Sequence, residues 1–195
     1  MTFEVRSLDP TVLEPRIGAR DDHFVELYDD DASLVESVRT YLSSGIAVGD
    51  AAVVIATPER RRAIEAALAT AVDLAGARQR GLYQALDAME TLALFMNGDV
   101  VDWPAFESVI GDVVARASTA GRDVRLFGEM VAVLWAGGNV SAALALEDAW
   151  NRLAADRRFR LFCAYPSYAF SDDDLDALTG VCNRHSHVLL AAPRP

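Results

Sequence analysis

The sequence predicts one three-layer α/β domain, in which a mostly parallel β-sheet carries helices on both faces. Two observations support this prediction. Short apolar runs alternate with amphipathic helical segments, and no repeat, low-complexity stretch or linker divides the 195 residues. Strands that alternate with helices of this length need crossover connections, which make the strands parallel and cover both faces of the sheet. We therefore expect an N-terminal extension over residues 1–19 and one domain over residues 20–192.

The expected strands are the apolar runs at 24–28, 51–58, 81–88, 123–129 and 159–166, with a final strand at 187–191. The run at 51–58, AAVVIATP, is apolar on both faces, as a strand inside a parallel sheet should be. For the same reason we expect 52–57, 124–127 and 160–165 to be central strands.

Polar residues and glycines mark the ends of the expected helices. Thr57 and Pro58 suit the start of one helix, and Asp87 with Glu90 forms a capping box for a helix that reaches Met96. Glycines are expected to end three helices: Gly45 the first helix, Gly121 the helix after Trp103, and Gly137 the segment at 130–136. Asn139 and Ser171 are expected to start two further helices.

Charge and composition exclude several classes of partner. The net charge is −11, whereas nucleic acids and anionic membranes are bound through basic surfaces. No apolar stretch approaches the ~18 residues of a membrane span, and the polar N-terminus lacks the apolar core of a secretory signal. Two cysteines, Cys163 and Cys182, are typical of reduced thiols rather than of a disulfide framework. We expect a cytoplasmic protein that binds neither nucleic acid nor membrane.

Ligands of parallel α/β sheets collect at the carboxyl ends of the strands. This rule nominates Tyr28, Thr57, Asp87, Glu129 and Tyr165. We expect a small-molecule site in one cleft, lined by a set of residues from four strand regions: His23, Tyr28, Asp87, Glu129, Cys163 and Tyr165.

Each of these residues also has a structural alternative. His23 could simply hydrogen-bond across the start of a strand, and Glu129 could cap the helix at 130–136 instead of serving as a base. Cys163 is either a small core residue or a buried thiol that faces a ligand.

The turn after the strand at 51–58 does not contain a phosphate-binding loop. Residues 59–62 are Glu-Arg-Arg-Arg, without the glycines and lysine that cradle a nucleotide phosphate. Ordinary nucleotide hydrolysis is therefore not expected. The arginines could hold another anion, but a solvated helix face is favoured.

Cys182, His185 and His187 have the residue types of metal ligands. Their spacing, Cys-x2-His-x-His, fits no common zinc pattern, and a histidine at the end of a helix is favoured by the helix dipole. We expect no metal and no cofactor. The sequence also lacks a Gly-x-Ser-x-Gly nucleophile elbow.

Several segments, in this order, resemble the MEDS family, the sensory domain shared with the repressor DcmR. They are HFVELYDD (23–30), GD-x-x-VVIATPE-x-R-x-AI (49–64), GLYQALDAMETLALFM (81–96), GRDVRLFGEMVAVLWAGGN (121–139), LE-x-x-WN (146–151), LFCAYP (161–166) and VCNRHSHV (181–188). The resemblance implies a RecA-like domain without the P-loop that senses small hydrocarbon derivatives. It directs attention to His23, Glu129, Cys163, Cys182 and His185.

The expected function is therefore a non-catalytic sensory or regulatory domain that binds a small organic ligand. The sequence shows no DNA-binding or kinase module after the domain, so the expected partner is a separate histidine kinase, sigma-factor regulator or transcription regulator, and the chain could form a homodimer. One alternative is a ligand-free module that docks a kinase or an anti-sigma-type regulator. Another is a thiol- or metal-dependent enzyme that uses Cys163 or the pair Cys182 and His185.

Overall fold

The computed structural model describes residues 6–7, 23–170 and 175–190. Within them a seven-stranded sheet has the order β1-β9-β2-β8-β7-β3-β4, and every neighbouring pair is parallel. The predicted mostly parallel sheet is confirmed. Its strands are β1 (Arg6–Ser7), β2 (His23–Tyr28), β3 (Ala51–Ala56), β4 (Tyr83–Asp87), β7 (Val124–Gly128), β8 (Arg160–Pro166) and β9 (His187–Leu190).

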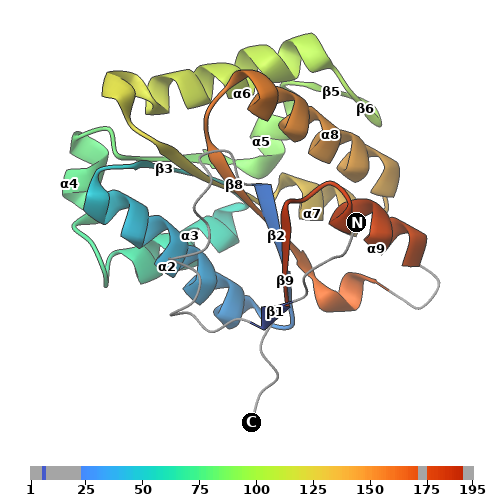
Figure 1. The fold of residues 1–195 in the computed structure, drawn as a ribbon, viewed down its shortest axis with the longest axis horizontal. Helices are drawn as coiled ribbons and strands as arrows, with labels where there is room; N and C mark the ends of the chain where they lie inside the picture. The colour runs from blue at the N-terminus through green and yellow to red at the C-terminus, as the bar shows by residue number, and fades with distance from the viewer. Residues whose placement is uncertain (1–5, 8–22, 171–174, 191–195) are drawn as a thin grey trace.

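Helices cover both faces of this sheet and form the outer layers (Figure 1). One face packs against α2 (Asp31–Val48), α3 (Pro58–Leu68) and α4 (Leu74–Gln79). The opposite face packs against α5 (Ala88–Ala93), α6 (Trp103–Ala117), α7 (Met130–Ala136), α8 (Val140–Asp156) and α9 (Leu175–Cys182). The three-layer α/β prediction is therefore confirmed.

Alternation along β2 and β8 determines which residues meet on each face. Successive side chains of a strand point to opposite faces of the sheet. His23 is paired with Leu161 and Val25 with Cys163, so these four side chains share the face covered by α8 and α9. Phe24 and the residues at every second position after it in β2 point to the opposite face of the sheet. There the hydrophobic core lies under α2 and α3.

The predicted central strands and most of the predicted helix starts are confirmed. β8, β7 and β3 are neighbours inside the sheet, and each is almost wholly buried. Thr57 and Asn139 cap α3 and α8 with their side chains, and the Asp87 carboxylate accepts hydrogen bonds from the first turn of α5. The start that we expected at Ser171 lies outside the described residues, as does the boundary near residue 19.

Gly45 does not end the first helix, contrary to our prediction. α2 continues to Val48 and ends at Gly49, whose φ of 94° is left-handed. Backbone N–H groups at this end bond back to the carbonyls of Gly45 and Ile46, as in a glycine C-cap. Gly45 is instead buried in the last part of the helix, where the side chain of Arg125 crosses it.

Two features were missed because their sequence signals are short. α4 has only six residues, and the predicted helix to Met96 ends at Ala93. Met96–Asn97 is strand β5, which pairs antiparallel with β6 (Val100–Val101) in a small hairpin. The helix α6 ends at Ala117, and a single 3-10 turn connects it to Gly121. None of the helices within the described residues is long and apolar enough to cross a membrane.

Candidate functional site

Four buried side chains meet beneath the sheet face that α8 and α9 cover; we call them the buried centre. They are His23, Glu147, Cys163 and His185. His23 begins β2, Cys163 lies within β8, Glu147 points inward from α8, and His185 follows α9. One potential ligand atom from each residue lies within 4.8 Å of the corresponding atom of every other.

The contacts inside the buried centre are short. His23 Nε2 lies 3.3 Å from Cys163 Sγ and 3.2 Å from Glu147 Oε2. Glu147 Oε2 is also 3.5 Å from His185 Nε2 and 3.7 Å from Cys163 Sγ. The rings of the two histidines are 4.1 Å apart between centroids. One oxygen of Glu147 therefore faces all three other side chains.

Hydrogen bonds outside the centre hold both imidazole rings in one orientation. His185 Nδ1 is 2.7 Å from the carbonyl oxygen of Val181, which can only accept, so Nδ1 carries a proton. Asn151 Nδ2 donates to the carbonyl of Arg184, which leaves its Oδ1 to accept from His23 Nδ1 at 2.9 Å. In the neutral form of each ring, Nε2 is then the nitrogen with the lone pair, and it faces the centre.

Glu147 is the charged group of the centre. Its side chain has no exposed surface. Burial by itself raises the pKa of Glu147, but the adjacent His185 and His23 outweigh burial and hold the pKa well below its ordinary value. Tyr165 donates its hydroxyl hydrogen to Oε1 at 2.9 Å, so Oε1 is satisfied from the strand side while Oε2 faces the histidines and Cys163.

The thiol of Cys163 and the Nε2 atom of His185 determine which chemistry the centre can support. Cys163 is 0% exposed, and burial together with the nearby Glu147 raises the pKa of its thiol well above the ordinary value. A thiol that keeps its proton is a poor nucleophile. His185 Nε2 is buried and makes no hydrogen bond of acceptable geometry within the described residues, although Glu147 lies close to it.

Glu147 and Asn151 were missed by sequence reasoning, although a signal for them was present. Glu147 lies between Leu146 and Trp150 on the buried stripe of α8, where a charged residue is unexpected. Both residues occur in the segment LE-x-x-WN, which we used only for the family resemblance.

Of the three possible metal ligands near the C-terminus, only His185 joins the centre. His187 is exposed on β9, with its Nδ1 at 3.1 Å from the Ser186 hydroxyl. Cys182 is half-buried at the end of α9, and it is not among the residues grouped with His185. The spacing of these three residues in the sequence therefore did not reveal the centre, because the partners of His185 come from β2, α8 and β8.

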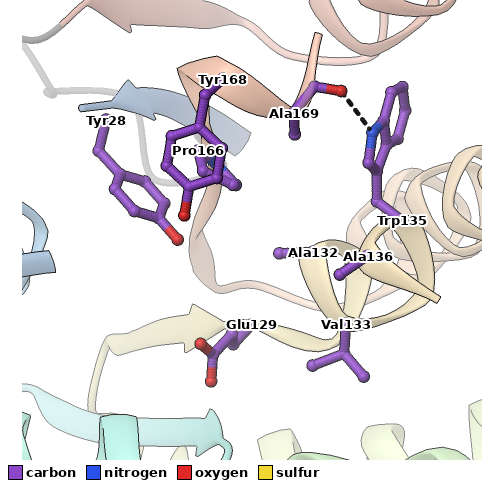
Figure 2. A pocket seen from close by; sticks show the side chains of 9 residues that line it. All are labelled: Tyr28, Glu129, Ala132, Val133, Trp135, Ala136, Pro166, Tyr168 and Ala169. Atoms are coloured by element: carbon purple, nitrogen blue, oxygen red, sulfur yellow. Dashed lines mark hydrogen bonds between the residues drawn. The ribbon is translucent and has the colours of Figure 1, made fainter. Parts of the chain in front are cut away.

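A second feature, the edge cleft, opens at the carboxyl ends of β2, β7 and β8. Its volume is about 460 Å³, and its walls are mainly apolar. Figure 2 shows the nine lining side chains around an open centre: Tyr28, Glu129, Ala132, Val133, Trp135, Ala136, Pro166, Tyr168 and Ala169. The loops after β2 and β8 leave toward opposite faces of the sheet, which is the geometry that creates ligand crevices in α/β folds.

Glu129 forms the polar end of this cleft. Its Oε2 accepts hydrogen bonds from the backbone N–H and the hydroxyl of Thr57, at 2.8 and 2.9 Å. Its Oε1 accepts from Arg60 Nε at 3.1 Å. Glu129 does not cap α7 with its side chain, so that structural alternative is wrong. A second cavity of about 600 Å³, between α2 and α3, also borders Glu129 and Arg60.

Arg60 does not lie on a solvated helix face, as we expected for the arginines of residues 59–62. Its side chain is 11% exposed and also bonds Asp31 at 2.7 Å and the hydroxyl of Tyr28 at 3.3 Å. Burial raises the pKa of Tyr28 to about 12, against the opposing charge of Arg60. Arg60 thus joins the ends of β2, β3 and β7.

Five of the six predicted site residues are divided between the buried centre and the edge cleft, so they do not form the single cleft that we expected. His23, Cys163 and Tyr165 belong to the buried centre or contact it, while Tyr28 and Glu129 line the edge cleft. The Asp87 side chain caps α5 instead. The two features adjoin through aromatic rings, because Trp135 of the cleft packs edge-on against Tyr165, with centroids 5.4 Å apart.

The strand order also corrects where a phosphate-binding loop would stand. Among the described residues, the first strand that lies inside the sheet is β2, between β9 and β8. The turn to compare is therefore that from Tyr28 to Asp31, not that after β3. It holds three consecutive aspartates and no glycine, and the Asp30 carboxylate accepts from Ala32 N and Ser33 N at the start of α2.

One known protein family matches most of the chain. The sequence model of the family described as MEDS, "MEthanogen/methylotroph, DcmR Sensory domain", matches residues 22–181. The match spans β2 to α9 and includes His23, Glu129, Glu147 and Cys163. No curated protein matches the chain. The chain belongs to the MEDS family of sensory domains.

Proposed function

We propose that the chain is a non-catalytic sensory domain that binds a small organic molecule in the edge cleft and signals to a separate output protein. The observation that carries the proposal is the cleft itself, about 460 Å³ in volume at the carboxyl ends of three strands. Small-molecule sites are usually clefts of roughly 300–1,000 Å³ with apolar walls and a few polar groups. Membership of a sensory family supports the same role.

The lining indicates the class of ligand. Ala132, Val133 and Ala136 form an apolar wall on α7, while the hydroxyls of Tyr28 and Tyr168 and the carboxylate of Glu129 supply the polar groups (Figure 2). This arrangement suits a small, largely apolar molecule that carries one hydrogen-bonding group. A hydrocarbon derivative, such as a short alcohol, amine or haloalkane, has these properties.

The cleft lies between α7 and the turn after β8, an arrangement that suits a sensor. Trp135 comes from α7, and its indole N–H donates to the carbonyl of Ala169 at 3.2 Å in the turn after β8 (Figure 2). A ligand between them would change the position of α7 relative to this turn. Because α7 packs directly on α8, a ligand that prefers one arrangement would shift the surface offered to a partner.

The enzyme alternative has less support. Cys163 is fully buried and its pKa is raised, so the thiolate that a thiol-dependent enzyme needs is disfavoured. The carboxylate of Glu129 accepts three hydrogen bonds, two from Thr57 and one from Arg60, which hold it in place. Neither group is therefore poised as a nucleophile or as a free base.

The test fills the cleft. Ala132→Phe places a ring in it, and Ala66→Phe, at an exposed position of α3 outside this lining, is the matched control. Binding of C1–C6 alcohols, amines and haloalkanes is measured by ligand-detected NMR, and native mass spectrometry reports any retained molecule. We expect the binding of at least one compound to fall at least tenfold in Ala132→Phe only. Absence of binding to the unchanged chain, or equal binding by both variants, contradicts the proposal.

A further inference from the structure

Four of the six separations between donor atoms of the buried centre are close to those of a tetrahedral metal site. Zinc bonds of about 2.0 Å to nitrogen and oxygen and about 2.3 Å to sulfur give ligand–ligand separations of about 3.3–3.6 Å in a tetrahedron. The four measured separations in the centre are 3.2, 3.3, 3.5 and 3.7 Å. The remaining two are also within 4.8 Å.

The state of each donor also suits a cation. Hydrogen bonds at Nδ1, to Asn151 and Val181, turn Nε2 of both histidines toward the centre, and Nε2 is the nitrogen that a neutral ring would offer to a metal ion. His185 Nε2 is buried and makes no hydrogen bond within the described residues. This nitrogen is therefore available to coordinate a cation. Tyr165 occupies the outer oxygen of Glu147 and leaves the inner one for a cation.

Charge balance points the same way. An ionised carboxylate without exposed surface is costly unless a positive charge compensates it. A divalent cation together with the Glu147 carboxylate and the Cys163 thiolate would form a neutral unit, and the thiol proton would leave to solvent on binding.

From these observations we propose that His23, Glu147, Cys163 and His185 bind one divalent transition-metal ion of the zinc class. The two nitrogens, one oxygen and one sulfur are donors that such ions accept in tetrahedral geometry. Four protein ligands leave no coordination position open, so the ion is structural. It ties together four segments of the chain: β2, α8, β8 and the segment after α9.

Metal content and cobalt spectroscopy of the full chain test this inference. We expect about one equivalent of zinc-class metal after purification without chelators. After the metal is stripped, Co²⁺ should give the visible bands of a tetrahedral ion and a thiolate charge-transfer band, saturating at one equivalent. Zn²⁺ should abolish these bands, and chelation should lower the Tm reversibly.

The sequence supplies matched controls for two of the ligands. Cys163→Ser should remove the thiolate band and His185→Gln should weaken metal binding at least 100-fold. Cys182→Ser and His187→Gln remove the same groups at positions outside the centre, and should bind as the unchanged chain does. Asn151→Ala, which releases the His23 ring, should weaken binding by about 10–100-fold.

The opposite results overturn the inference. One is a folded, unchanged chain that neither retains metal nor binds Co²⁺ or Zn²⁺ stoichiometrically. Another is a thiolate charge-transfer band that survives Cys163→Ser or disappears in Cys182→Ser. If the ligand variants do not fold, the unchanged chain decides the matter through its metal content and the effect of chelation on its Tm.

Discussion

Glu26 is a carboxyl group buried within the sheet. It lies in the middle of β2 and is 1% exposed. The hydroxyl of Ser37, on α2, donates to its Oε1 at 3.3 Å, while Oε2 has no hydrogen-bond partner within the described residues. Burial raises the pKa of Glu26 to about 7, although the hydrogen bond from Ser37 opposes this. The neutral acid is therefore favoured in the folded chain.

This raised pKa predicts how stability depends on pH. Between pH 4.5 and about 7 the folded chain holds a proton that the unfolded chain has lost. The stabilisation is present below this window and is lost as the pH rises through it. Glu26→Gln cannot ionise, so relative to the unchanged chain its free energy of unfolding should increase across the window, by roughly 3 kcal/mol at most. Urea unfolding at several pH values measures the difference.

Glu36 on the exposed side of α2 provides the control for Glu26. The hydrogen bond from Arg39 lowers the pKa of Glu36, so its contribution to stability is lost as the pH falls. Glu36→Gln should therefore give a small change of the opposite sign. A Glu26→Gln profile parallel to that of the unchanged chain would show that Glu26 is already solvated and ionised.

Two buried glycines in the interiors of helices make a matched pair at the scale of the element. A Cβ at Gly45 would lie 2.5 Å from both Cδ and Nε of Arg125. That arginine is held by Asp50, Tyr41 and Ser44 and cannot move without losing these bonds. We predict that Gly45→Ala destabilises the chain by about 1–3 kcal/mol, because at least one bond to a charged group is lost. Thermal or urea unfolding measures this loss.

Gly111 in α6 should respond in the opposite sense. A Cβ there would meet only Leu153 Cδ1, at an ordinary distance of 3.8 Å. Gly111→Ala should therefore gain about 0.5–1 kcal/mol from the greater helix propensity of alanine. Equal effects at the two positions would mean that the contact with Arg125 does not determine why glycine occupies position 45.

The elements that could be predicted from sequence are those whose signal is local. The apolar run of β3 specifies that strand within a few residues. The capping side chains Thr57 and Asn139 likewise specify where α3 and α8 begin. The predicted end of α2 was wrong because glycine occupies position 45 to make room for the side chain of Arg125. This contact spans 80 positions of the sequence, so no local pattern indicates it. The hairpin of β5 and β6 was missed because each strand has only two residues.

At the scale of the whole molecule, the buried centre shows what sequence reasoning could not combine. His23 and Cys163 were expected in one site and do lie in contact, although 140 positions separate them. Glu147 completes their arrangement, but its position on α8 relative to β8 depends on how the helix packs. The position of the edge cleft could be predicted more directly from the sequence, because Tyr28 and Glu129 lie at the ends of parallel strands that share one edge of the sheet.

The carboxyl edge of the sheet carries its own anions where a nucleotide phosphate would bind. Asp30 occupies the first N–H groups of α2, and Glu129 accepts from Thr57 at the start of α3. With no glycine-rich turn after β2 and a net charge of −11, a triphosphate would meet repulsion and no cradle. We predict that Mg-ATP gives no measurable heat in calorimetric titration and no phosphate release above the rate in buffer, with a known ATPase run in parallel. Turnover at an ordinary ATPase rate that Glu129→Gln abolishes would contradict this, and would mean that Glu129 leaves Thr57 and Arg60 to act on a water.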